Sequence, residues 1–207
     1  IINKYMFLYK YSNRKLIREK LNKFFEIPII KILNYFKIKP NHISILGLVL
    51  AFISAYFISN SNFILSPIFL LLSGVCDLLD GSLARYTKSV TKFGGILDSV
   101  LDRFGEAAIF IGILIYFSAY ESNIPNILFL LALASSTVVT YLRSKAETLN
   151  IKCEIGIMTR TERLLVLFFS LILCNFVDFI LLISIIAIFV LSLFTVFQRI
   201  NHIYKSI

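Results

Sequence analysis

Six apolar segments, each close to the length of a membrane-spanning helix, most constrain how this 207-residue chain can fold. A helix needs about 20 predominantly apolar residues, and at least about 17, to cross the hydrocarbon core of a bilayer. The segments lie at residues 43–60, 63–80, 95–118, 125–142, 162–175 and 177–198. The segment at 162–175 needs flanking residues to reach across. The sequence therefore predicts an all-α membrane protein with six transmembrane helices.

The composition agrees with this class of protein. Hydrophobic residues make up 58% of the chain and charged residues 16%, whereas soluble domains have about 45–50% and about 25%. The three cysteines, Cys76, Cys153 and Cys174, have no metal-ligand spacing, which favours packing roles and implies no disulfide framework.

The basic residues predict the topology. All 21 Lys and Arg lie before residue 43 or in the segments 85–103, 143–163 and 199–205, and the alternate linkers contain none. With six spans these segments lie on one side, which the positive-inside rule makes cytoplasmic, together with both termini. The net charge of +9 is therefore confined to one face, which argues against nucleic acid and favours an anionic membrane surface or substrate.

The basic N-terminal segment, residues 1–42, has apolar residues at helical spacing within 16–36. This pattern predicts an amphipathic juxtamembrane helix lying in the membrane interface, with Pro28 bending or breaking it. A disordered basic tail is the alternative, and it suits residues 1–12. Pro40 is expected to end the segment, with Asn41 or Ser44 capping the first helix of a six-helix domain at 43–207.

Four aspartates lie where two apolar segments meet the basic loop at 85–92. A carboxylate at the centre of a spanning helix costs roughly 2.5 to 3.5 kcal/mol, so the four need compensation. Asp77 and Asp80 share a helix face with Gly81 and Ala84, and Asp98 and Asp102 are one turn apart. If the two helices pack antiparallel, the carboxylates converge. Hard oxygen ligands suit Mg²⁺, Mn²⁺ or Ca²⁺, and two such ions would balance four charges.

The stretch from Asp77 to Asp102 resembles the signature of the CDP-alcohol phosphatidyltransferases. These enzymes transfer the phosphatidyl group of a CDP-linked lipid to an alcohol and release CMP. The resemblance implies a six-span fold with a juxtamembrane helix, a homodimer, and CDP-diacylglycerol or CDP-archaeol as the lipid substrate. All eight fixed positions are present, namely Asp77, Asp80, Gly81, Ala84, Arg85, Gly94, Asp98 and Asp102.

The same resemblance implies the roles of the site residues. Asp77, Asp80 and Asp98 would bind two Mg²⁺ or Mn²⁺ ions, and Asp102 would be the general base and a further metal ligand. The residues expected to contact the CDP-lipid are Asp77, Gly81, Ala84, Arg85 and Gly94. Because one substrate is a lipid and the other is water-soluble, the site is expected at the cytoplasmic surface of the cell membrane.

A later basic cluster bears on the acceptor alcohol. The sequences around Arg143 and Arg160 are similar to the branch of the family that uses inositol 1-phosphate, with Thr140, Ser144 and Lys145 replacing Ser, Ala and Arg. Arginine and lysine bind phosphate well, which favours a phosphorylated acceptor. The positive-inside rule alone is the other explanation. The candidates for the acceptor phosphate are Arg143, Lys145, Arg160, Arg163 and Arg199.

Several alternatives stay open at this point. Glycerol 3-phosphate could replace inositol 1-phosphate as the acceptor, because the same cations would serve it. A cation transporter is an alternative of another class, since intramembrane acids often mark ion paths. Glu162 is expected to pair with a neighbouring arginine. Glu106, one turn beyond Asp102, is either an outer partner of the metal site or a packed carboxyl.

Overall fold

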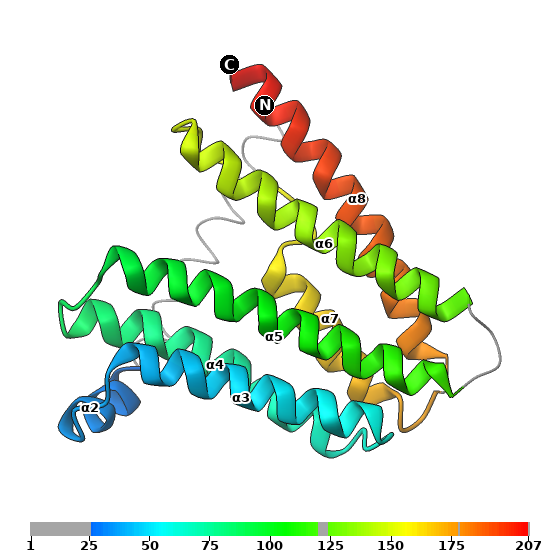
Figure 1. Ribbon diagram of the computed structural model, residues 1–207, viewed down its shortest axis with the longest axis horizontal. Helices are drawn as coiled ribbons and strands as arrows, with labels where there is room; N and C mark the ends of the chain where they lie inside the picture. The colour runs from blue at the N-terminus through cyan, green and yellow to red at the C-terminus, as the bar shows by residue number, and fades with distance from the viewer. Residues whose placement is uncertain (1–25, 120–123, 178, 207) are drawn as a thin grey trace, which may run out of the picture.

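The computed structural model describes residues 26–119, 124–177 and 179–206 (Figure 1). These residues form helices and connecting turns and contain no strand, which confirms the all-α prediction. The helices are α2 (Ile27–Tyr35), α3 (Pro40–Ser59), α4 (Leu65–Tyr86), α5 (Lys92–Ser118), α6 (Ile124–Thr148), α7 (Arg160–Leu173) and α8 (Ile180–Ser206).

Each of the six predicted apolar segments forms one helix, from α3 to α8. Within the described residues α3, α4, α6 and α8 are long and apolar enough to cross a membrane. Helix α5 is 27 residues long but contains Asp98, Asp102, Arg103 and Glu106, and α7 has only 14 residues. The membrane class is therefore supported, whereas the count of six spans stays a prediction.

Helix α2 begins beside Pro28, which occupies its first turn. Proline is well suited to this position because its missing N–H would have no partner there in any helix. Whether Pro28 also bends or breaks a longer helix, as predicted, depends on residues outside the described part of the chain. Ile30 is buried in a cluster with Leu79 and Leu83 of α4, whereas Tyr35 is exposed. The predicted helix at 16–36 extends into residues 1–25, which lie outside the described part of the chain.

Helix α3 begins at Pro40, three residues before the predicted domain boundary. The residue preceding it, Lys39, makes no side-chain cap, so the prediction that Asn41 or Ser44 caps this helix is wrong. Proline in the first turn has no N–H, so one of the unpaired donors at the start of the helix is absent. Ser44 lies one turn further into the helix. Its hydroxyl instead donates to the carboxylate of Asp80 at 2.6 Å.

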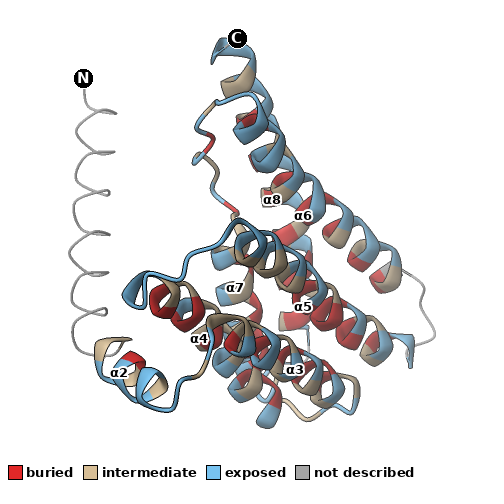
Figure 2. Cartoon of the chain, turned by 60° about the vertical axis from the view of Figure 1, so that its left-hand side comes forward, coloured by how far each residue is buried: buried red, intermediate tan, exposed pale blue. Residues whose placement is uncertain are grey.

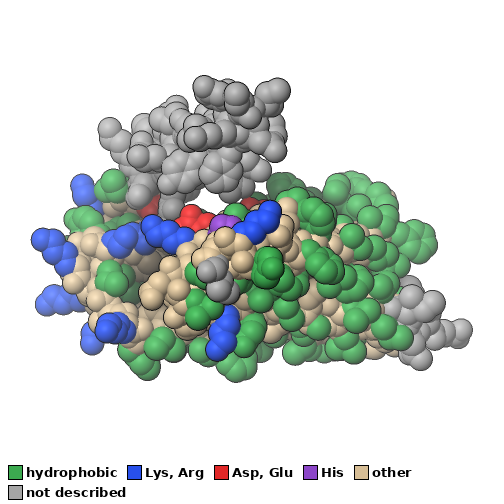
Figure 3. Space-filling view, turned by 90° about the horizontal axis from the view of Figure 1, so that it is seen from above, with side chains coloured by type: hydrophobic (Ala, Val, Ile, Leu, Met, Phe, Trp, Pro, Cys, Tyr) green, Lys and Arg blue, Asp and Glu red, His purple; other side chains and the backbone are tan. Residues whose placement is uncertain are grey.

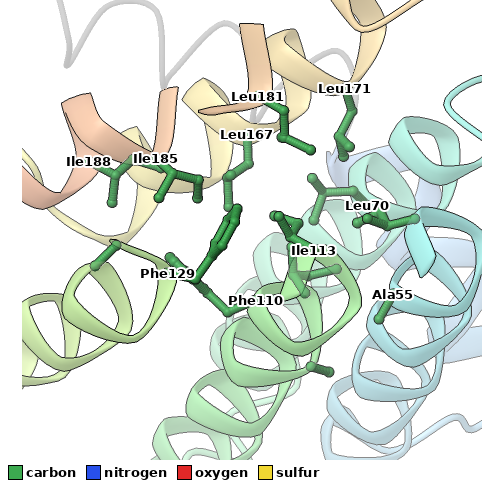
Figure 4. Packing of buried hydrophobic residues seen from close by; sticks show 14 of the residues in the cluster. Ala55, Leu70, Phe110, Ile113, Phe129, Leu167, Leu171, Leu181, Ile185 and Ile188 are labelled. Atoms are coloured by element: carbon green, nitrogen blue, oxygen red, sulfur yellow. The ribbon is translucent and has the colours of Figure 1, made fainter. Parts of the chain in front are cut away.

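The helices form two groups with α7 between them. Helices α3, α4 and α5 lie together, α6 and α8 form a pair, and α7 contacts both α4 and α8 (Figures 1 and 2). Buried side chains line the surfaces between these groups, and the main core joins the six helices from α3 to α8 (Figure 4). Core residues from the six helices include Ala55, Leu70, Phe110, Ile113, Phe129, Leu167 and Ile185.

Candidate active site

Helix α3 brings the two aspartate-bearing helices together. It packs closely on both α4 and α5, which have few direct contacts with each other. Small residues allow this approach: a Cβ on Gly47 would lie 3.1 Å from the Cβ of Cys76, and one on Gly105 would lie 3.4 Å from that of Ala51. The expected direct packing of α4 on α5 is thus replaced by packing through α3.

The aspartate carboxylates lie close together, as predicted. Asp77, Asp98 and Asp102 each place one carboxylate oxygen within 4.8 Å of the others, and all three are partly buried. Asp80 joins them in lining a cavity of about 20 Å³, which is room for one or two small ions or waters. Clustered carboxylate oxygens are the donors that Mg²⁺ and Mn²⁺ prefer, so these residues fit a divalent-metal centre.

Asp80 differs from the other three aspartates in its surroundings. It is 6% exposed, accepts a hydrogen bond from the hydroxyl of Ser44, and accepts another at 2.5 Å from the backbone N–H of Gly81. Both bonds orient the carboxylate beside the cavity. Ser44 was not identified as a site residue from the sequence, because no spacing rule connects it to an aspartate on another helix.

Arg160 lies directly against the aspartate cluster. Its Nη1 atom is 3.0 Å from Oδ1 of Asp77 and 2.5 Å from Oδ2 of Asp102. The arginine comes from the first residue of α7, so a third helix contributes charge to the site. Thr159 and Glu162 form a capping box at this end of α7. The T-x-x-E pattern at 159–162 is a sequence signal that could have predicted this helix start.

A second cavity, of about 390 Å³, adjoins the aspartates. Asp98, Asp102 and Arg160 line both this cavity and the smaller one. Its wall is completed by helices α6 and α8, and its lining includes the predicted acceptor cations Arg143 and Arg199. The structure thus places positive side chains and the carboxylate of Asp102 around one space large enough for a small sugar phosphate.

The other two predicted acceptor cations do not line either cavity. Lys145 is exposed near the end of α6. Arg163 is fully buried, and its Nε and Nη2 atoms lie 2.6 and 3.0 Å from the two carboxylate oxygens of Glu106. Glu106 is therefore a largely buried carboxylate bound to an arginine, and it also lines the larger cavity, so its role at the site stays a prediction.

The residues predicted to contact the CDP-lipid lie at the end of α4 and the start of α5. The guanidinium of Arg85 donates to Ser82 at 2.7 Å and lies over Gly81, where a Cβ would come within 3.3 Å of it. The backbone N–H of Gly94 donates to Thr91, which caps α5. Gly81, Ala84, Arg85 and Gly94 do not line the two cavities described above.

The comparisons with known proteins identify the family. A family model described as CDP-alcohol phosphatidyltransferase matches residues 37–197, which include every helix from α3 to α7 and most of α8. The chain belongs to the CDP-alcohol phosphatidyltransferase family. The assignment made from the motif at 77–102 is thus confirmed, and the comparisons give the cation-transporter alternative no support.

Named relatives and solved structures extend this comparison. The archaetidylinositol phosphate synthase of Methanothermobacter thermautotrophicus is 33% identical over 172 residues, covering 81% of this chain and 84% of that protein. The crystal structure of Mycobacterium tuberculosis phosphatidylinositol phosphate synthase with manganese and citrate has a TM-score of 0.79 at 25% identity, covering 86% and 88%. The same protein with CDP-DAG bound also gives a TM-score of 0.79, at 24% identity, covering 87% and 94%.

The chain is therefore an integral membrane enzyme that transfers a substituted phosphate group from a CDP-linked alcohol. The aspartate cluster fits the divalent-metal requirement predicted for it. The number of ions, the choice between Mg²⁺ and Mn²⁺, and the roles of individual residues stay predictions.

Proposed function

We propose that this enzyme transfers the phosphatidyl or archaetidyl group of CDP-diacylglycerol or CDP-archaeol to inositol 1-phosphate and releases CMP. The observation that supports this acceptor most directly is the cavity of about 390 Å³ that joins arginines to the aspartate cluster. A phosphorylated polyol needs positive charge for its phosphate and a base beside its hydroxyl, and this cavity offers both. The names of the archaeal and mycobacterial relatives are consistent with the same acceptor.

In this proposal the four aspartates hold two divalent ions, Mg²⁺ or Mn²⁺. Bound divalent ions supply positive charge to the pyrophosphate oxygens and hold the reacting groups in line. Asp77, Asp98 and Asp102 offer oxygens from two facing helices, and Ser44 orients Asp80 beside them. Removal of divalent ions with EDTA is expected to stop CMP release, and added Mg²⁺ or Mn²⁺ to restore it.

Asp102 is proposed as the general base. It lines both cavities, so its carboxylate can face the acceptor hydroxyl on one side and the lipid phosphate on the other. The hydroxyl oxygen forms a bond to the lipid-bearing phosphorus while the bond from that phosphorus to the CMP oxygen breaks. CMP leaves with the bonding electron pair, and Asp102 takes the hydroxyl proton.

Arg143, Arg160 and Arg199 are proposed to hold the acceptor phosphate, because all three line the larger cavity. Lys145 and Arg163 lack this support. At the other side of the aspartates, Gly81, Ala84, Arg85 and Gly94 are proposed to contact the CDP-lipid, together with Asp77. Small residues at 81 and 84 leave space on the helix face that carries Asp77 and Asp80.

We also propose that α3 to α8 make six spans of the cell membrane, with both termini and the active site on the cytoplasmic side. Chain direction supports this topology, because the aspartates and every described Lys and Arg belong to the same ends of the helices. The division into a basic segment at 1–42 and a six-helix domain at 43–207 is part of the proposal, with α3 starting slightly before the boundary. A homodimer remains a prediction from the family resemblance.

Glycerol 3-phosphate is the second candidate acceptor, because it presents the same phosphate charge to the same arginines. Purified enzyme given CDP-diacylglycerol or CDP-archaeol, Mg²⁺, and one acceptor at a time separates the candidates. We expect inositol 1-phosphate to support CMP release and a phosphoinositol lipid by mass spectrometry, with free inositol as the matched acceptor lacking phosphate. Product with glycerol 3-phosphate alone, or equal rates with free inositol, would contradict the proposed acceptor.

A further inference from the structure

The buried ion pair between Glu106 and Arg163 lies one helical turn below the active site. Arg163 has no exposed surface, and Glu106 is 7% exposed. The two side chains meet in the bidentate geometry that gives the strongest carboxylate pairs, and Nη1 of Arg163 also donates to the backbone carbonyl of Met158 at 3.3 Å. This arginine therefore has all its polar contacts inside the protein and none with either cavity.

This pair is the second of two successive ion pairs between α5 and α7. Glu106 follows Asp102 by one turn on α5, and Arg163 follows Arg160 by one turn on α7. Side chains at these spacings lie on the same face of their helix. The first ion pair joins Arg160 to Asp102, and the second joins Arg163 to Glu106. The two ion pairs constrain the height and the rotation of the start of α7 against α5, in addition to the packing of α7 on α4 and α8.

Arg160 depends on this placement because it has little else to hold it. Its Nε atom is buried without a hydrogen-bond partner among the described residues, and its Nη1 atom contacts the carboxylates of Asp77 and Asp102. Since Arg160 is the first residue of α7, a small shift of that helix would move its guanidinium away from both cavities.

We propose that Glu106 and Arg163 are positioning residues that hold α7 at the height where Arg160 reaches the aspartates and the acceptor cavity. Arg163 lines neither cavity, and Glu106 lines the acceptor cavity while both of its carboxylate oxygens are bound to Arg163. This inference rests on the proposed role of Arg160 in binding the acceptor phosphate. It implies that loss of the buried pair weakens binding of the acceptor and not of the CDP-lipid. Lysine at 163 would keep the charge but lose the two-pronged contact that sets the geometry.

The test is a double-mutant cycle in the full-length enzyme in detergent, using Arg163→Lys, Arg160→Gln and the double variant. We expect Arg163→Lys to raise the KM for inositol 1-phosphate about tenfold, as is typical for partners that orient a site residue, and to leave the KM for CDP-diacylglycerol unchanged. In the Arg160→Gln background the same substitution is expected to add no further increase, because its effect acts through Arg160.

Three outcomes would overturn the inference. Equal increases from Arg163→Lys in both backgrounds would show an effect independent of Arg160. An increase from Arg160→Gln alone, with none from Arg163→Lys, would overturn the positioning role but leave the proposed function standing. An unchanged acceptor KM in Arg160→Gln would remove the proposed phosphate role and the inference together. If Arg163→Lys fails to fold, Glu106→Gln replaces it in the same cycle, since the amide keeps the shape but loses the charge that holds Arg163. Because Glu106 also lines the acceptor cavity, an effect that disappears in the Arg160→Gln background supports the positioning role, and one that persists there overturns it.

Discussion

The guanidinium of Arg160 contacts the carboxylates of Asp77 and Asp102, whereas those of Arg163 and Arg199 are enclosed by protein. Arg199 donates to the backbone carbonyls of Val139 at 2.5 Å and Ile155 at 2.9 Å, which joins α8 to α6 and to the segment before α7. At the residue scale, similar cations therefore serve different purposes. Arg160 lies against the aspartates, Arg163 is bound within the protein, and Arg199 both lines the acceptor cavity and links the elements around it.

Arg143 offers the cleanest test of the acceptor cavity. It lines this cavity from α6 and is itself exposed, so its loss should not disturb packing. A charged hydrogen bond to phosphate contributes about 1.5–3 kcal/mol, so Arg143→Gln should raise the KM for inositol 1-phosphate by roughly ten- to a hundredfold. Steady-state kinetics with each substrate varied in turn measures this.

Lys152→Gln is the matched control, because Lys152 is an exposed cation on the same predicted side and lines neither cavity. An equal rise in acceptor KM for both variants would mean that general surface charge, and not the cavity, attracts the acceptor.

Aspartates were easier to predict than arginines, and the reason is physical. A carboxylate in an apolar helix is costly enough that its position alone signals a site, and helical spacing then gives the shared face. Arginines at the cytoplasmic ends satisfy the positive-inside rule wherever they point. The separate environments of Arg160 and Arg163 depend on which helix lies beside α7, and one sequence does not carry that information.

At the element scale, the packing of α3 on α5 controls the site from a distance. A Cβ on Gly112 would lie 2.5 Å from the carbonyl oxygen and 2.8 Å from the Cα of Ala55, so the two helices touch through their backbones there. Gly105 lies on the same face of α5, two turns nearer the aspartates, where it approaches Ala51. Small residues therefore allow α3, which lies between α4 and α5, to pack closely on α5.

Gly112→Ala should destabilise the protein, because the added methyl group has no room without moving backbone. Overpacking of this kind costs about 1–3 kcal/mol, so the Tm followed by circular dichroism in detergent should fall. Gly74→Ala is the control, since a Cβ on Gly74 meets nothing within 4 Å and alanine favours helix. A Tm for Gly112→Ala equal to or above that of Gly74→Ala would contradict this account of the packing.

Apolar segments located the six helices from α3 to α8 but not their ends. The predicted segments at 63–80 and 125–142 stop before the observed ends of α4 at Tyr86 and α6 at Thr148. Hydropathy detects the part of a helix that crosses hydrocarbon, whereas backbone hydrogen bonding continues into the polar interface. The extended ends matter here because they carry Arg85 and Arg143.

The whole molecule has one charged end and one apolar end. Basic side chains gather toward the left in Figure 3, where the aspartate end of the helices lies, and hydrophobic side chains cover the right-hand part of this face. Such an arrangement suits an enzyme that takes one substrate from the membrane and another from water. It also gives the proposed topology a physical basis. Basic residues favour the cytoplasmic side, and they attract the anionic lipids of that side.

The proposed topology predicts which loops are accessible from outside the cell. Ser61 lies in the turn between α3 and α4, and Ser89 lies in the turn between α4 and α5. In a Cys174→Ser background, which removes the partly exposed native thiol, a membrane-impermeant maleimide should label Ser61→Cys in intact cells and label Ser89→Cys only after lysis. The reverse pattern would mean that the active site faces outward.

The central claim is that the aspartate cavity performs the transfer with Asp102 as its base, and the Asp102→Asn variant tests it most directly. Loss of a general base lowers turnover by about 10²- to 10⁴-fold, so CMP release should nearly vanish while CDP-diacylglycerol still binds in an equilibrium assay. Glu154→Gln, at an exposed carboxylate away from both cavities, should retain full activity. Turnover by Asp102→Asn at the wild-type rate would contradict the mechanism.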